Sequence, residues 1–255
     1  MGFFFDLLHP GLWAMALSVA LLGGIVKGVV GFAMPMVIIL GLSSFIEPEL
    51  ALAGLILPTL VTNVAQALRQ GSAAAWASAM RYRVFLCVGG TLLIASAQLV
   101  RVLPMNALLG LIGIPVIVFA VTQLVGLRLK LSRQRTDVEA VFGAVTGLMG
   151  GVSGIWGPST VMYLTALGTE KSEQMRVQGV IYGLGAVALV FAHLGSGVLR
   201  AETLPLGFAL ILPALLGQWI GGHVLERIDQ VVFRRVTLFF LLVAGLNLVR
   251  RAVFF

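Results

Sequence analysis

Residues 27–35 read KGVVGFAMP, and residues 150–158 read GGVSGIWGP. Each stretch interrupts an apolar window that is too long for one membrane helix. Residues 7–46 contain no Lys, Arg, Asp or Glu except Lys27, and as one helix they would be roughly 60 Å long, against a hydrocarbon core of about 30 Å. Residues 140–169 would be about 45 Å long. Glycine loosens a helix and proline removes a backbone donor, so we predict that the chain breaks and turns back at both stretches.

The two interruptions are related by an internal repeat. At a constant offset of 123 residues, five pairs of identical residues recur. These are Gly24 with Gly147, Gly28 with Gly151, Gly31 with Gly154, Pro35 with Pro158 and Glu47 with Glu170. The repeat predicts two transmembrane halves, at residues 12–126 and 138–252, joined by a basic linker at residues 127–137.

Composition points to a polytopic membrane protein. Hydrophobic residues make up 59% of the chain and charged residues only 11%, less than half of the roughly 25% typical of soluble domains. This excludes a soluble enzyme and a disordered binder. The net charge of +7 comes from basic residues in loops without any nucleic-acid-reading pattern, so we expect a lipid bilayer and no nucleic acid as partner. The single cysteine and three scattered histidines argue against a metal site, and no cofactor is implied.

Basic residues predict the orientation, because cytoplasmic loops hold the excess of Lys and Arg. With Lys27 set aside, 16 remain. If each long window crosses once, the halves are parallel and the two sides carry 10 and 6. If each window is a hairpin that enters and leaves on one side, the halves are inverted and the sides carry 12 and 4. We therefore predict an all-α membrane protein of two inverted repeats, each a broken or re-entrant helical hairpin plus three transmembrane helices, with about eight hydrophobic segments.

Paired helix breaks indicate a transporter's substrate site. Proline fits the first turn of a helix, so Pro35 and Pro158 should open the returning arms, whose free N–H groups favour an anion. Lys27 is the only cation within an apolar window. We expect Lys27 to bind the anion; the alternative is that its side chain extends to the membrane interface.

The other candidate substrate-binding residues lie beside a break or on the polar face of the helix that follows it. They are Gly28, Gly31, Asn63, Gln66, Gly151, Ser153, Gly154, Trp156, Gly157, Ser159, Gln178 and Tyr182. The glycines could instead serve close helix packing, and the polar faces could serve hydrogen bonding between helices. Trp156 would act as an apolar wall or gate of the site; alternatively, it only packs between helices.

Two other classes of function are weighed. Residues 151–154 read GVSG, and with His193 on the next helix Ser153 could form an intramembrane serine protease. The repeat counterpart, residues 28–31, lacks the serine, which suggests that the glycines serve backbone geometry. The other alternative is a non-transporting structural membrane protein, which needs no paired breaks.

The order of the motifs resembles the TauE/SafE sulfite exporter family of bacterial inner-membrane permeases. The residues that carry this resemblance are KGVVGFAMP at 27–35, PTLVTNVAQ at 58–66 and GLMGGVSGIWGP at 147–158, and the likeness spans essentially the whole chain. It implies transport of sulfite, sulfonates or other small organic anions. The family's glycine-rich signatures fall on Gly28, Gly31 and Pro35 and on Gly151, Gly154 and Pro158. The family commonly has Gly-Gly-Gly before each proline, but this chain has Phe-Ala-Met at residues 32–34 and Ile-Trp-Gly at residues 155–157. We expect these side chains to narrow the substrate site.

Together, these observations predict a secondary transporter of a small anion in the bacterial inner membrane that works by alternating access, with both termini periplasmic. Export is slightly favoured, because a monovalent anion leaving the cell gains about 2.3 kcal/mol per 100 mV. No Asp or Glu lies inside an apolar window, so a carboxylate proton relay is not expected. The coupling ion and a homo-oligomeric state are left open.

Overall fold

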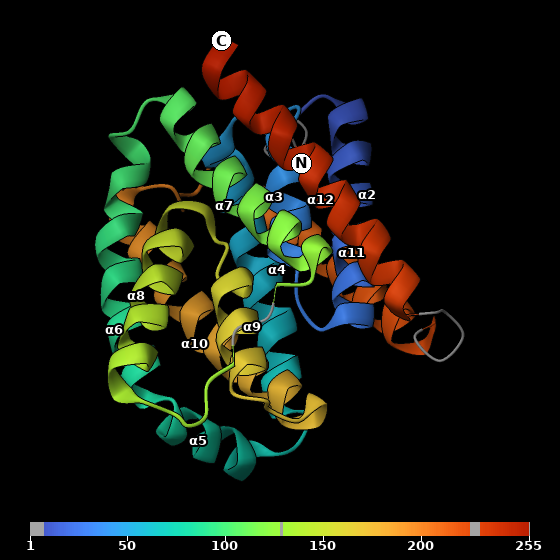
Figure 1. Cartoon of the computed structure of the whole chain (residues 1–255). Helices are drawn as coiled ribbons and strands as arrows, with labels where there is room; N and C mark the ends of the chain where they lie inside the picture. The colour runs from blue at the N-terminus through green and yellow to red at the C-terminus, as the bar shows by residue number, and fades with distance from the viewer. Residues whose placement is uncertain (1–7, 128–129, 225–229, 255) are drawn as a thin grey trace.

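The computed structural model describes residues 8–127, 130–224 and 230–254, and all regular secondary structure in these ranges is helical. The first half of the chain forms α2 (Pro10–Val30), α3 (Met34–Ser43), α4 (Pro48–Leu68), α5 (Ser72–Arg81), α6 (Arg83–Ala97), the 3-10 helix η1 (Gln98–Arg101) and α7 (Met105–Val125). The second half forms α8 (Thr136–Ser153), α9 (Gly157–Ala166), α10 (Lys171–Ser196), α11 (Leu204–Val224) and α12 (Gln230–Phe254). The predicted all-α fold class is confirmed (Figure 1).

Within the described residues, six helical segments are long and apolar enough to cross a membrane. They lie in α2, α4, α6 with η1, α7, α10 and α11. The short helices α3 and α9 have ten residues each, or about 15 Å, and α8 carries Asp137 and Glu139 in its first turn. The molecule is therefore a multi-pass membrane protein, while the count of eight hydrophobic segments stays a prediction.

Both helix breaks occur where the sequence predicts them. Three residues separate α2 from α3, and three separate α8 from α9. Pro35 and Pro158 are each the second residue of the returning helix. Gly31 and Gly154 end the preceding helices with φ angles of 82° and 68°, a left-handed conformation that glycine adopts without steric cost.

The offset of 123 residues also recurs in the helix boundaries. The ends of α2 and α8, both ends of α3 and α9, and the starts of α4 and α10 are each 123 residues apart. The repeat seen in a few identical residues therefore extends to the local structure of the whole break region.

Glycines let helices from different halves pack closely. A Cβ on Gly28 of α2 would overlap the backbone of Gln218 in α11, and a Cβ on Gly151 of α8 would overlap that of Leu93 in α6. Close helix packing, the alternative interpretation, is therefore present at both glycines, while their contact with substrate stays a prediction. At the centre of the bundle α4 packs against α10, and α7 lies alongside α12 (Figure 1).

The central pair, α4 and α10, runs antiparallel. A Cβ on Gly179 would lie 2.7 Å from the backbone nitrogen of Ala67, and one on Gly183 would lie 3.8 Å from the backbone of Asn63. Because the contact moves forward along α10 as it moves backward along α4, the two helices point in opposite directions. The two polar faces predicted from the sequence are therefore carried by one helix pair.

Candidate functional site

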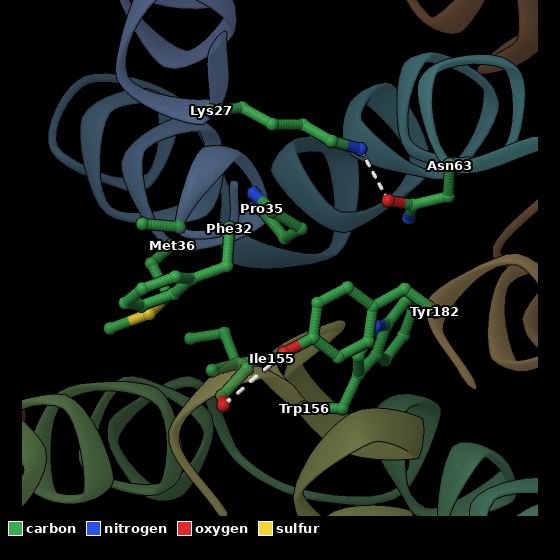
Figure 2. A pocket seen from close by; sticks show the side chains of 10 residues that line it. Lys27, Phe32, Pro35, Met36, Asn63, Ile155, Trp156 and Tyr182 are labelled. Carbon is green, nitrogen blue, oxygen red and sulfur yellow. Dashed lines mark hydrogen bonds between the residues drawn. The ribbon is translucent and has the colours of Figure 1, made fainter. Parts of the chain in front are cut away.

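The two helix breaks meet at a small cavity between the halves of the chain. The cavity lies between first-half residues, drawn above in Figure 2, and second-half residues, drawn below. It is lined by Lys27, Phe32, Ala33, Pro35, Met36, Asn63, Ile155, Trp156, Gly157 and Tyr182. The space between the atoms is about 270 Å³ including its opening, and its interior has room for about one water molecule. The surrounding side chains thus hold the cavity nearly closed.

Lys27 projects from the last turn of α2 into the protein. Its side chain is only 2% exposed, and Nζ donates hydrogen bonds to Thr62 Oγ1 at 2.9 Å and to Asn63 Oδ1 on α4 (Figure 2). The alternative considered for Lys27, a side chain that extends to the membrane interface, does not agree with this burial. Its two partners are neutral oxygens, and no ion pair to it occurs among the described residues. A buried cation without a counter-charge is costly, so a bound anion would complete this arrangement.

The returning helices α3 and α9 both begin at the cavity. Pro35 and Met36 of α3 line it, and so does Gly157 of α9. The N–H groups at the start of a helix have no partner within it, and neither α3 nor α9 has a side chain that caps them. Together with the partial positive charge of a helix N-terminus, such groups form a site that favours anions.

Two further donors at the cavity have no hydrogen-bond partner among the described residues. They are Asn63 Nδ2 and Trp156 Nε1, both fully buried. Because the Asn63 oxygen accepts from Lys27, its NH₂ group is the part left for another ligand. A buried donor without an acceptor costs about 1–3 kcal/mol, and a ligand made of acceptors would remove this cost.

Several predicted site residues lie next to the cavity without lining it. Gln66 Nε2 donates to the Gly31 oxygen at 3.2 Å and to the Met175 oxygen at 3.0 Å, so it ties the first break to α10. Gln178 is buried with its Oε1 unpaired among the described residues. Direct contact of Gln66 or Gln178 with substrate stays a prediction.

The hydroxyls around the second break are engaged inside the second half. Ser153 Oγ donates to the Met149 oxygen at 2.6 Å and accepts from the Ile155 nitrogen at 3.2 Å. Ser159 Oγ lies 2.6 Å from Thr146 Oγ1. These bonds fix the backbone of the break. Tyr182 does line the cavity, and its hydroxyl donates to the Gly157 oxygen at 3.4 Å (Figure 2).

The protease alternative finds no support in this geometry. His193 Nε2 lies 3.0 Å from the Gly151 oxygen and Nδ1 lies 3.0 Å from Ser196 Oγ. Ser153 and His193 share no hydrogen bond in the described part of the chain. His193 therefore bonds the Gly151 backbone and Ser196, and among the described residues the printed partners of Ser153 Oγ are backbone groups.

Two residues at or beside the cavity, Thr62 and Met36, are not among those predicted from the sequence. Thr62 lies three residues after Thr59 and next to Asn63, on the polar face of the same helix. This spacing could have indicated Thr62 as a site residue. Phe32 and Ile155 belong to residues 32–34 and 155–157, which the sequence predicts to narrow the site, and both line the cavity. Met36 also lines it, and no sequence pattern indicates this.

Comparison with known proteins decides the family. The family model described as Sulfite exporter TauE/SafE matches residues 16–248 of the 255. The chain belongs to the TauE/SafE sulfite exporter family. No curated protein and no solved structure matches it. Membership of TauE/SafE makes this multi-pass protein a membrane transporter of anions, which agrees with the resemblance drawn from the motifs.

Proposed function

We propose that this TauE/SafE protein moves a small anion across the bacterial inner membrane by alternating access, with sulfite, a sulfonate or another organosulfur or organic anion as substrate. One observation carries the proposal. The only buried lysine among the described residues and the open N-termini of two broken helices, one from each half, converge on a single cavity. Positive charge and free donors at mid-bundle favour an anion.

The roles of the side chains follow from their contacts. Lys27 Nζ and Asn63 Nδ2 bind the anion from the first half, and the backbone N–H groups at the starts of α3 and α9 bind it from both ends. Tyr182 and Trp156 form the opposite wall. Gln66 holds the first break through its hydrogen bond to the Gly31 oxygen, and Gln178 is buried next to Gly31. The glycines at both breaks give the backbone its shape.

We further propose that the halves, residues 12–126 and 138–252, are inverted repeats joined by the linker 127–137. Equivalent helices point in opposite directions in the α4 and α10 pair. The packing of α2 on α11 has its counterpart in that of α8 on α6. Both observations are expected of a two-fold axis in the membrane plane.

Ion pairs between the halves support alternating access. At one end of the α4 and α10 pair, Arg81 Nη1 lies 2.5 Å from Glu173 Oε1. At the other end, Arg200 Nη1 lies 2.9 Å from Glu49 Oε1. Exposed pairs contribute about 0–1 kcal/mol each, so rocking one half against the other can open one pair at little cost while the other stays closed.

The grouping of basic residues supports a cytoplasmic linker and periplasmic termini. Arg81 bonds Gln134 of the linker region, whereas Arg101 and Arg251 bond backbone oxygens at the opposite end, beside Arg200. This is the division that the hairpin arrangement requires, with more basic residues on the linker side. A membrane potential that is negative inside then favours export of an anion from the cytoplasm.

A ligand-induced thermal shift of the purified protein tests the function. Sulfite, alkanesulfonates, carboxylates and halides are compared at equal concentration and ionic strength. We expect sulfite or a short sulfonate to stabilise the folded state by about 2.7 kcal/mol at one hundred times its Kd. The proposal fails if no anion raises the melting temperature, or if Lys27→Met leaves the shift unchanged.

A further inference from the structure

The indole of Trp156 fills a space left by two glycines on neighbouring helices. A Cβ on Gly150 of α8 would lie 3.0 Å from Cε3 of Trp156, and a Cβ on Gly185 of α10 would lie 3.8 Å from its Cε2. The ring also packs against Tyr182, with the ring centroids 6.3 Å apart. Trp156 is 2% exposed and lines the cavity (Figure 2). It therefore closes the second-half side of the cavity.

The same place in the first half holds the lysine. With the offset of 123 residues, Gly150 corresponds to Lys27, Gly185 to Thr62 and Trp156 to Ala33. Lys27 reaches from α2 to Thr62 on α4, as Trp156 spans the gap between α8 and α10. The two halves thus fill equivalent spaces with opposite chemistry, a cation in one half and an aromatic ring in the other.

We propose that Trp156 determines the size of the anion that the protein accepts. This inference rests on the proposed function. An anionic head group held at Lys27 and Asn63 directs the rest of the molecule toward Trp156 and Tyr182, which face them across the cavity. The indole stands where a longer substrate would extend. Removing it would leave an apolar space at least as large as the engineered cavities of about 150 Å³ that bind benzene.

Binding of linear alkanesulfonates, from methanesulfonate to hexanesulfonate, tests this with the full-length purified protein. For the wild type we expect affinity to fall as the chain lengthens. For Trp156→Ala we expect longer chains to bind more tightly than short ones, by about fourfold per methylene buried. Trp156→Leu retains a smaller apolar side chain, so the longest sulfonate that it binds well should be intermediate between those of the wild type and Trp156→Ala. This variant replaces Trp156→Ala in the test if the alanine variant does not fold.

Phe119→Ala is the matched control, because Phe119 is an equally buried ring that packs on Phe32, with centroids 5.9 Å apart, and does not line the cavity. It should lower stability without changing the dependence on chain length. An unchanged cut-off in both Trp156 variants, or the same extension in Phe119→Ala, overturns the role of Trp156 while sulfite binding by the wild type leaves the proposed function standing. Absence of binding by every anion, sulfite included, overturns both.

Discussion

Lys27 Nζ lies 2.9 Å from Thr62 Oγ1, and both side chains are buried. The bond joins the last turn of α2 to α4 at the level where α4 crosses α10, since the neighbouring Asn63 faces Gly183. The position of the cation is therefore set by the helix crossing at the centre of the molecule and not by the break alone. The charge is held where both halves meet, which is what a site shared by two halves requires.

Replacing Lys27 with Met should weaken anion binding at least tenfold, because hydrogen bonds to charged groups contribute about 1.5–3 kcal/mol. The ligand-free variant should melt no lower than the wild type, since Met fills a similar volume without a buried charge. Titration calorimetry and thermal melts measure the two effects. Lys130→Met, at an exposed linker position, is the control and should change neither. Unchanged affinity in Lys27→Met would remove this residue from the site.

Thr62→Val should destabilise the ligand-free protein by about 1–3 kcal/mol, because Lys27 loses one of its two oxygen partners. The effect should shrink when Lys27 is already Met. A double-mutant cycle of thermal or chemical unfolding measures the coupling. Equal losses in both backgrounds would mean that Thr62 stabilises the protein only through its other bonds, chiefly that to the Pro58 oxygen.

The first break contains a strained alanine. Ala33 has a φ of 76°, the only positive φ of a non-glycine residue in the described chain, and this conformation costs roughly 1–2 kcal/mol for an L-residue. Ala33→Gly should therefore raise the melting temperature. Gly31→Ala should lower it, because the new Cβ would strain the backbone at a φ of 82° and would also force the end of the Met175 side chain to move. Gly71→Ala, at a φ of 89° with open space around it, isolates the cost of strain. Equal losses at Gly31 and Gly71 would contradict the packing argument.

Much of this fold follows from chain length against bilayer thickness. A window of 40 apolar residues has to turn back, and glycine with proline marks where, so the breaks and the prolines of α3 and α9 were predictable. The fate of Lys27 was not, because burial or extension to the interface depends on which helix covers it. Thr62 and Asn63 on α4 decide this, 35 and 36 residues away.

In the candidate site, too, the sequence predicts the local features and long-range packing decides the rest. A repeat register predicts that two helix ends correspond, but it gives no information on which hydroxyls remain available. Ser153 and Ser159 are adjacent to the second break, yet both satisfy their hydrogen bonds inside the second half. Residues 32–34 and 155–157 were expected to narrow the site, but that Phe32 and Ile155 line one shared cavity depends on a long-range arrangement that no local pattern encodes.

Cysteine labelling tests the membrane orientation. In a Cys87→Ser background, Ser132→Cys should react with a membrane-impermeant thiol reagent only from the cytoplasmic side, and Val253→Cys only from the periplasmic side. Both positions are exposed, so burial does not limit the reaction. Labelling of both residues from one side would favour parallel halves over inverted ones.

The two ion pairs between the halves should bias the protein toward opposite open states. With Met36→Cys as a reporter inside the cavity, again without Cys87, Glu173→Gln should speed labelling from the linker side and Glu49→Gln from the opposite side. Each effect should reach about fivefold, the equivalent of 1 kcal/mol for an exposed pair. Sealed vesicles of known orientation separate the two sides.

Glu202→Gln is the control for these two ion pairs as gates, that is, as contacts that keep one side of the cavity closed. Glu202 pairs with Arg200 at 3.5 Å, but both belong to the second half, so the loss of this pair leaves the contact between halves intact. Its labelling rates should match those of the wild type. If Glu49→Gln and Glu173→Gln speed labelling from the same side, or if Glu202→Gln has an equal effect, the variants loosen the protein generally and the pairs do not act as gates.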